Sequence, residues 1–214
     1  MTQLIVVRHG RTEWNDTGRI QGASDIALDD VGVEQAARAA DALASYQPDR
    51  IISSDLVRAS DTAKRVAEVT GVEVELDERL RERSYGPWEG LRMSEISQRY
   101  PEDHERWRSG KPLKHPDIET WEALRKRSGG LVDELKSGDG VTLIFTHGGT
   151  ARQIVGAALD WSQEDTGTLA GLDNVHWADI REMKSGRWRL FGYNLGIKDT
   201  SQLGMSRIVR EQQK

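Results

Sequence analysis

Two histidines occupy matching places in two apolar segments of the chain. His9 ends the stretch LIVVRHG, His147 lies in TLIFTHGG, and each is followed by glycine. A neutral imidazole can act as a nucleophile, and a neighbouring glycine lets the backbone come close to a ligand. If the two segments form neighbouring strands, these two rings share one site although they are far apart in the sequence.

Two arginines are expected beside these rings. Arg8 directly precedes His9, and Arg58 stands in IISSDLVRASDTAKRV, where a strand ends and a helix is expected to start near Asp55. A guanidinium offers a planar pair of N–H donors that matches phosphate oxygens. The helix expected after His147 adds free N–H groups and the positive end of its dipole. Each of these residues alone could equally be a surface residue or a buried group whose hydrogen bonds are satisfied, but their combination indicates a phosphate site.

The surrounding segments alternate between two apolar patterns. Runs rich in Val and Ile are typical of strands that a parallel sheet buries on both faces, and apolar residues at helical spacing are typical of amphipathic helices. Strands are expected at 3–7, 49–53, 72–76 and 141–145, and helices at 30–46 and 56–70. This alternation predicts an α/β sandwich, in which ligands bind beyond the carboxyl ends of the strands.

The second half is less regular. MSEISQRY and ETWEALRKRSGGLVDELK indicate helices on either side of the polar stretch PEDHERWRSGKPLKHPD. The segment 91–136 is therefore expected to be a polar helical insertion over the active site. A late β-hairpin is expected from 174–180 and 188–193, turning at 184–186. Residues 1–214 are expected to form a single domain.

Composition excludes several classes of function. A formal charge of −5 lacks the excess of lysine and arginine that nucleic acids or anionic membranes require. Without cysteine, disulfides, cysteine nucleophiles and thiolate metal sites are excluded. A strand that begins by Gln3 leaves no room for a signal peptide, so a cytoplasmic location is expected. No metal or cofactor is expected, because the site arginines would repel a divalent cation. A homodimer is left open.

A series of motifs runs through most of the chain in a characteristic order. RHGRTEWN, GRIQG, ALDDVGVEQA, SSDLVRASDTA, RLRERSYGPWEGL and TLIFTHGG together resemble the histidine phosphatase superfamily, also called the phosphoglycerate mutase-like family. The resemblance covers Leu4 to about Leu159. It implies a three-layer α/β/α sandwich with a mostly parallel central sheet, and a mechanism that passes through a phosphohistidine.

Catalytic roles follow from the residues and the resemblance together. His9 is the expected nucleophile, and Arg8 and Arg58 should lower its pKa so that it is neutral at physiological pH. His147 is expected to donate a hydrogen bond to the equatorial oxygens of the phosphate, together with the N–H of Gly148.

The proton donor is identified through the resemblance, which implies that Glu82 is the general acid and then the general base toward water. A salt bridge to Arg79, Arg81 or Arg83 is the structural alternative for this carboxylate, and Glu89 is a weaker candidate for the same role.

Further substrate contacts are also implied by the resemblance. Asn15 matches a position that contacts phosphate, and Gln21 with Gly22 matches positions that border the substrate. The alternative is that these residues only hold their loop.

Three functions are compatible with this site. A phosphomonoesterase acting on a small phosphorylated metabolite is favoured, because the segment after Trp88 lacks the Arg-Arg pair and proline cluster that true mutases use. The alternatives are a 2,3-bisphosphoglycerate-dependent phosphoglycerate mutase and a non-catalytic phosphate-binding module. DNVHW and GRWRLFGYN resemble the actinobacterial branch that contains glucosyl-3-phosphoglycerate phosphatases, whereas HPDIET departs from the usual GGES.

Overall fold

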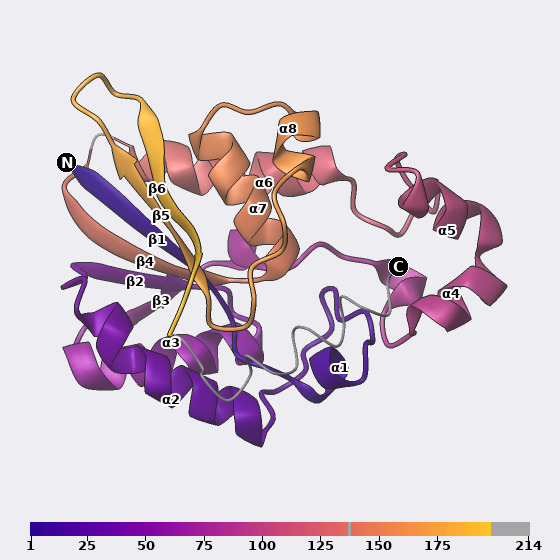
Figure 1. Ribbon diagram of the computed structural model, residues 1–214, viewed down its shortest axis with the longest axis horizontal. Coiled ribbons are helices and arrows are strands. Elements are labelled where there is room, and N and C mark those ends of the chain that lie inside the picture. Colours follow the sequence, from indigo (N-terminus) through magenta and orange to yellow (C-terminus); the bar gives the residue numbers. More distant parts are fainter. Residues whose placement is uncertain (137, 198–214) are drawn as a thin grey trace.

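A six-stranded sheet forms the centre of the molecule in the computed structural model, which describes residues 1–136 and 138–197 (Figure 1). Its strand order is β3-β2-β4-β1-β5-β6; β1 to β4 are parallel neighbours, and β5 and β6 are antiparallel. The strands are β1 Thr2–Arg8, β2 Arg50–Ser53, β3 Val74–Leu76, β4 Gly140–Thr146, β5 Trp177–Glu182 and β6 Trp188–Leu195. The expected mostly parallel sheet is confirmed.

Helices cover both faces of this sheet (Figure 1). The α-helices are α1 Glu13–Asp16, α2 Asp30–Ala44, α3 Val57–Thr70, α4 Met93–Arg99, α5 Pro101–Arg108, α6 Trp121–Leu135, α7 Gly148–Ala158 and α8 Gln163–Gly167, with 3-10 turns at Glu78–Leu80 and Gly86–Trp88. Helices α2 and α3 pack on one face, and α6 and α7 on the other. The expected three-layer α/β/α sandwich is therefore confirmed.

Successive side chains of β1 point to opposite faces of the sheet, so this one strand contributes to the core on both sides. Leu4 and Val6 pack in the core beneath α6 and α7, whereas Ile5 and Val7 pack against α2 and α3, and all four are fully buried. Successive side chains of a strand point to opposite faces, so a continuous apolar run suits a sheet covered on both sides. This burial sets the register in which Arg8 of β1 lies opposite Thr146 of β4.

The predicted boundaries need several corrections. α5 lies within the stretch expected to be irregular, because proline at its start, acidic residues in its first turn and arginines in its last turn favour a helix. α3 starts at Val57 rather than near Asp55, since the carboxylate of Asp25 accepts the Val57 N–H from outside the helix. β5 starts at Trp177 because Val175 turns the chain with a φ of 54°.

The segment 91–136 divides into two parts. Helix α6 supplies Leu131 and Val132 to the main core and so belongs to the layer that covers the sheet. Helices α4 and α5 lie away from the sheet (Figure 1), and α4 contributes Ile96 to a small separate core with Trp88 and Ile118. That α4 and α5 cover a bound substrate stays a prediction, as does the single domain; residues 198–214 lie outside the described part. No helix in the described residues is long and apolar enough to cross a membrane.

Candidate active site

His9 and His147 meet at the carboxyl ends of β1 and β4. Each follows its strand directly, and the His9 N–H donates to the carbonyl of Thr146 at 3.0 Å, which extends the parallel ladder by one step. The two ring centroids lie 5.1 Å apart with an angle of 58° between the planes. Both side chains are buried. The structure thus brings together the two rings that the sequence places in separate motifs.

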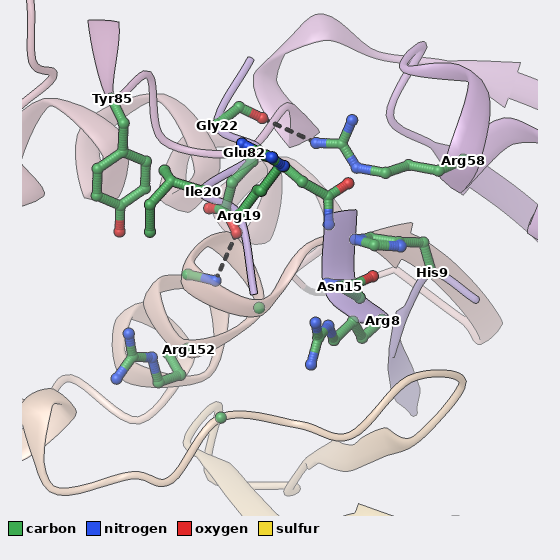
Figure 2. Close-up of a pocket in the computed structure, with 14 residues that line it drawn as sticks. Arg8, His9, Asn15, Arg19, Ile20, Gly22, Arg58, Glu82, Tyr85 and Arg152 are labelled. Carbon is green, nitrogen blue, oxygen red and sulfur yellow. Dashed lines mark hydrogen bonds between the residues drawn. The ribbon is translucent and has the colours of Figure 1, made fainter. Parts of the chain in front are cut away.

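The His9 ring is held in one tautomer. Its Nδ1 lies 2.7 Å from the carbonyl oxygen of Gly10, which can only accept, so Nδ1 carries the hydrogen and Nε2 carries the lone pair. Burial, and then the charges of Arg58 and Arg8, hold the pKa of His9 well below its usual value. The ring is therefore neutral at physiological pH and presents a free nitrogen beside the cavity drawn in Figure 2.

His147 is positioned by a serine at the end of β2. Its Nε2 lies 3.0 Å from the hydroxyl of Ser54, and that hydroxyl oxygen already accepts the Leu56 N–H at 3.3 Å. The serine can donate its hydrogen to Nε2, and in that tautomer the imidazole hydrogen lies on Nδ1. This Nδ1 is buried and has no partner among the described residues. Burial and the charge of Arg58 lower the pKa of His147, so this ring is neutral as well.

Arg8 is the last residue of β1, and Arg58 lies in the first turn of α3. Arg8 donates to the carbonyl of Leu172 at 2.6 Å, and Arg58 donates to those of Ser24 at 2.7 Å and Gly22 at 2.8 Å. The Nε of each arginine is buried without a partner in the described part of the chain. Burial lowers the pKa of Arg58 to about 10, so it keeps its charge at neutral pH.

Glu82 lies at the start of α7 rather than in a salt bridge. Its oxygens accept the N–H groups of Gly149 at 2.8 Å, Thr150 at 3.2 Å and Arg83 at 2.8 Å. The first turn of a helix has free N–H groups that suit a carboxylate. A Cβ on Gly149 would lie 2.6 Å from the Glu82 carboxylate, so a larger residue there would displace this carboxylate.

The neighbouring arginines have other partners. Arg79 binds Asp77 and Glu134, Arg81 binds Asp55, and Arg83 donates to a backbone carbonyl; the described residues show no salt bridge from any of them to Glu82. Glu89, the weaker candidate, accepts from the Ala23 and Tyr85 N–H groups and the Ser24 hydroxyl, and so holds a loop.

Asn15 and Gln21 extend the site. The Asn15 side-chain oxygen accepts from Thr12 and closes the first turn of α1, and the residue also lines the cavity. The Gln21 side-chain oxygen is buried and has no partner among the described residues. Gly22, at φ 55°, offers its carbonyl to Arg58. Asn15 therefore holds its loop and borders the cavity at the same time.

The cavity beside His9 has a volume of about 290 Å³. All the predicted site residues line it except His147, whose ring centroid lies 5.1 Å from that of His9. Residues without a prediction also line it: Arg19, Ile20, Tyr85, Gly149, Arg152 and Gly171. Of these, Gly149 and Arg152 could have been found from the sequence, because they lie in the first turns of the helix expected after His147. Tyr85 and Gly171 reach the cavity through loops whose course has no sequence pattern.

Metal ligands were also sought in the described residues. No group of three or more histidine, aspartate or glutamate side chains there could hold an ion.

Comparison with known proteins adds independent evidence. The family model of the histidine phosphatase superfamily (branch 1) matches residues 4–196. The chain is 33% identical to glucosyl-3-phosphoglycerate phosphatase of Mycobacterium tuberculosis over 218 residues, covering 94% of this chain and 98% of the relative. It is 41% identical to phosphoserine phosphatase 1 of Hydrogenobacter thermophilus over 107 residues, covering 50% and 51%.

A solved structure is similar over most of the chain. Mycobacterial glucosyl-3-phosphoglycerate phosphatase in complex with VO3 has a TM-score of 0.84 and 34% identity, covering 91% of this chain and 99% of that one.

Proposed function

The chain belongs to the histidine phosphatase superfamily and is a phosphomonoesterase, and we propose that it acts through a phosphohistidine formed on His9. The state of the His9 ring carries this proposal: it is buried, its Nδ1 hydrogen is donated to Gly10, and its Nε2 holds the lone pair. A neutral imidazole can attack a phosphate dianion without adding another negative charge, and the covalent intermediate divides one slow step into two.

In the first step Nε2 of His9 attacks the phosphorus. The N–P bond forms as the bond to the ester oxygen breaks, and that oxygen takes a proton from Glu82. Arg8, Arg58 and the Nδ1–H of His147 donate to the equatorial oxygens. These donors are part of the folded site, so little reorganisation is needed when charge develops.

In the second step water attacks the phosphorus of the phosphohistidine. Glu82, now a carboxylate, accepts a proton from the water as the N–P bond breaks and inorganic phosphate leaves. Both starting groups are then restored, with His9 neutral and Glu82 protonated. The same carboxyl group can serve in both steps, a role supported by its position among the residues that line the cavity with His9.

Hydrolysis of the phosphohistidine is favoured over transfer of the phosphoryl group back to the substrate. Both named relatives are phosphatases, which supports hydrolysis over the mutase alternative. For the substrate, we propose glucosyl-3-phosphoglycerate as the first compound to examine, since the relative with that name matches nearly the whole chain. Phosphoserine is the second, because the relative that matches half of this chain is a phosphoserine phosphatase.

The phosphohistidine is tested with the variant His9→Ala. We expect it to lower phosphate release by about 10³-fold or more and to abolish the acid-labile phosphoryl-enzyme. A matched control is His104→Ala, which removes an imidazole outside the cavity and should retain activity. Chelator-sensitive hydrolysis that survives His9→Ala would refute the mechanism.

The reaction type is tested with a panel of metabolites. 3-Phosphoglycerate, phosphoserine and glucosyl-3-phosphoglycerate are incubated with and without 2,3-bisphosphoglycerate. Release of phosphate without the bisphosphate supports the phosphatase proposal, and isomerisation that depends on the bisphosphate supports the mutase.

A further inference from the structure

An arginine without an acidic partner lines the cavity away from His9. Arg152 lies on α7, one turn beyond the residues that hold Glu82. Figure 2 shows Arg152 and Tyr85 on one side of the cavity, with His9, Arg8 and Arg58 on the other. A ligand whose phosphate lies at His9 would therefore extend toward Arg152.

The Arg152 guanidinium is unusual among the arginines of this region. Arg79, Arg81 and Arg127 each form an ion pair with a carboxylate. For Arg152, the described residues provide no hydrogen bond and no ion pair; its guanidinium carbon lies 5.5 Å from the ring centre of Trp121. A half-buried cation that packs on an aromatic ring keeps its N–H donors available to a ligand.

The other cations of the cavity are already engaged. Arg19 donates to the carbonyl of Gly90 at 2.6 Å and lies 3.7 Å from Glu95, which partly matches its charge. Arg8 and Arg58 lie at the phosphate end and donate to backbone carbonyls there. Arg152 is therefore the cation best placed to bind a second anionic group on the same substrate.

We propose that Arg152 is a specificity-determining residue that binds a carboxylate of the substrate, whose class is then a small phosphomonoester of a hydroxy acid. The planar guanidinium matches a carboxylate through two parallel N–H···O bonds. This inference rests on the proposed function and narrows its substrate. Glycerate and serine, the acids named in the two relatives' substrates, each carry such a carboxylate, separated from the phosphorylated oxygen by two carbon atoms.

The test compares substrates that differ only at the carboxylate. The pairs are 3-phosphoglycerate with glycerol 3-phosphate, and phosphoserine with phosphoethanolamine. We expect the unmodified protein to prefer the acid of each pair by about 10- to 100-fold in kcat/KM. Arg152→Gln should bring this ratio close to one, chiefly through KM, and Arg152→Lys should keep part of it. Arg65→Gln, an exposed arginine on α3, is the control that should keep the full ratio.

Binding provides a second readout that does not depend on turnover. Calorimetry with the His9→Ala protein should show tighter binding of 3-phosphoglycerate than of glycerol 3-phosphate, and Arg152→Gln in that background should remove the difference. Equal binding and equal turnover of both pair members by the unmodified protein would overturn the carboxylate proposal. A binding preference without hydrolysis of any ester would instead overturn the proposed function and leave the role of Arg152 supported.

Discussion

Buried N–H groups without partners gather around His9. Arg8 Nε, Arg58 Nε and His147 Nδ1 are all covered, and the described residues offer none of them an acceptor. A buried donor left unpaired costs about 1–3 kcal/mol. Arg8 and Arg58 line the cavity, so a phosphate bound there could supply acceptors that these side chains lack. Buried donors of this kind are what a phosphate site requires, and they support the proposed assignment of the site residues.

The role of Glu82 can be tested through the leaving group. Glu82→Gln keeps the hydrogen-bonding shape of the side chain but removes the proton that the leaving oxygen needs. We expect about a 10²- to 10⁴-fold loss with 3-phosphoglycerate, whose alkoxide leaves poorly, and a much smaller loss with nitrophenyl phosphate. The measurement is kcat for both substrates; Glu89→Gln is the comparison variant, since that carboxylate holds a loop. Equal slowing of both substrates by Glu82→Gln would argue against general acid catalysis.

At the level of elements, helix α6 holds the segment that ends at Glu82. Arg127 on α6 donates to the carbonyls of Arg79 at 2.7 Å, Arg81 at 2.8 Å and Glu82 at 3.0 Å, and its remaining N–H groups bind Glu119. All the donors of this guanidinium are therefore used. One side chain connects the helix layer to the loop that carries the expected acid.

This connection predicts that Arg127 positions Glu82 without touching substrate. Arg127→Met keeps the aliphatic stem but removes the donor to the Arg79 and Glu82 carbonyls and the ion pair with Glu119, so we expect a loss of about 1–3 kcal/mol in the free energy of unfolding. The kcat should fall more than KM rises, because the acid is displaced rather than the phosphate site. Lys126→Met, the exposed neighbour, should change stability by no more than about 0.5 kcal/mol. A stable Arg127→Met protein with unchanged kcat would contradict this role.

A small apolar core connects the wall of the cavity to the helical segment outside the main layers. The small core around Trp88, Ile96 and Ile118 has Ile20 and Tyr85 packed against it, and both of these line the cavity. Helix α4 thus supports the wall of the site through apolar packing, although it contributes no lining residue within the described chain. Packing of this kind can set the width of the cavity.

At the scale of the whole molecule, charge is unevenly distributed. The chain has a formal charge of −5, yet Arg8, Arg19, Arg58 and Arg152 line one cavity. A cavity of one sign concentrates ligands of the opposite sign even when the net charge would repel them. Burial is the main cause of the lowered pKa values of His9 and His147, and these cations lower them further.

The two neutral histidines predict how global stability depends on pH. Their pKa values lie below 6.5 in the folded protein, so the unfolded chain binds more protons once the pH falls below about 6.5. Their contribution to stability is therefore complete above that pH and is lost as the pH falls. At pH 5.5 the loss is about 1 kcal/mol for each ring.

Denaturant unfolding between pH 7.5 and pH 5.5 measures this effect. The free energy of unfolding should decrease toward pH 5.5 in the unmodified protein, and His9→Asn should show roughly half the decrease. An unchanged slope in His9→Asn would contradict the assignment of a lowered pKa to that ring.

Much of this organisation could be predicted from local patterns. The apolar runs before His9 and His147 specify buried parallel strands, and the residue that follows such a strand must lie at its carboxyl end. The fold class, the pairing of these two strands and the gathering of Arg8, His9 and Arg58 follow from that rule. Periodicity and residue chemistry are properties of short segments, so the linear chain displays them directly.

The remaining features depend on how segments pack against one another. Ser54 contacts His147, Arg127 holds the segment before Glu82, and Arg152 is left without an acid partner. Each of these relations is set by the angles between helices, sheet and loops, which no short sequence pattern encodes. Side chains such as arginine can reach several alternative partners, and the packed core selects among them. The residue types thus determine which chemistry is possible, whereas the packing of the helix layers on the sheet determines which partner each side chain contacts.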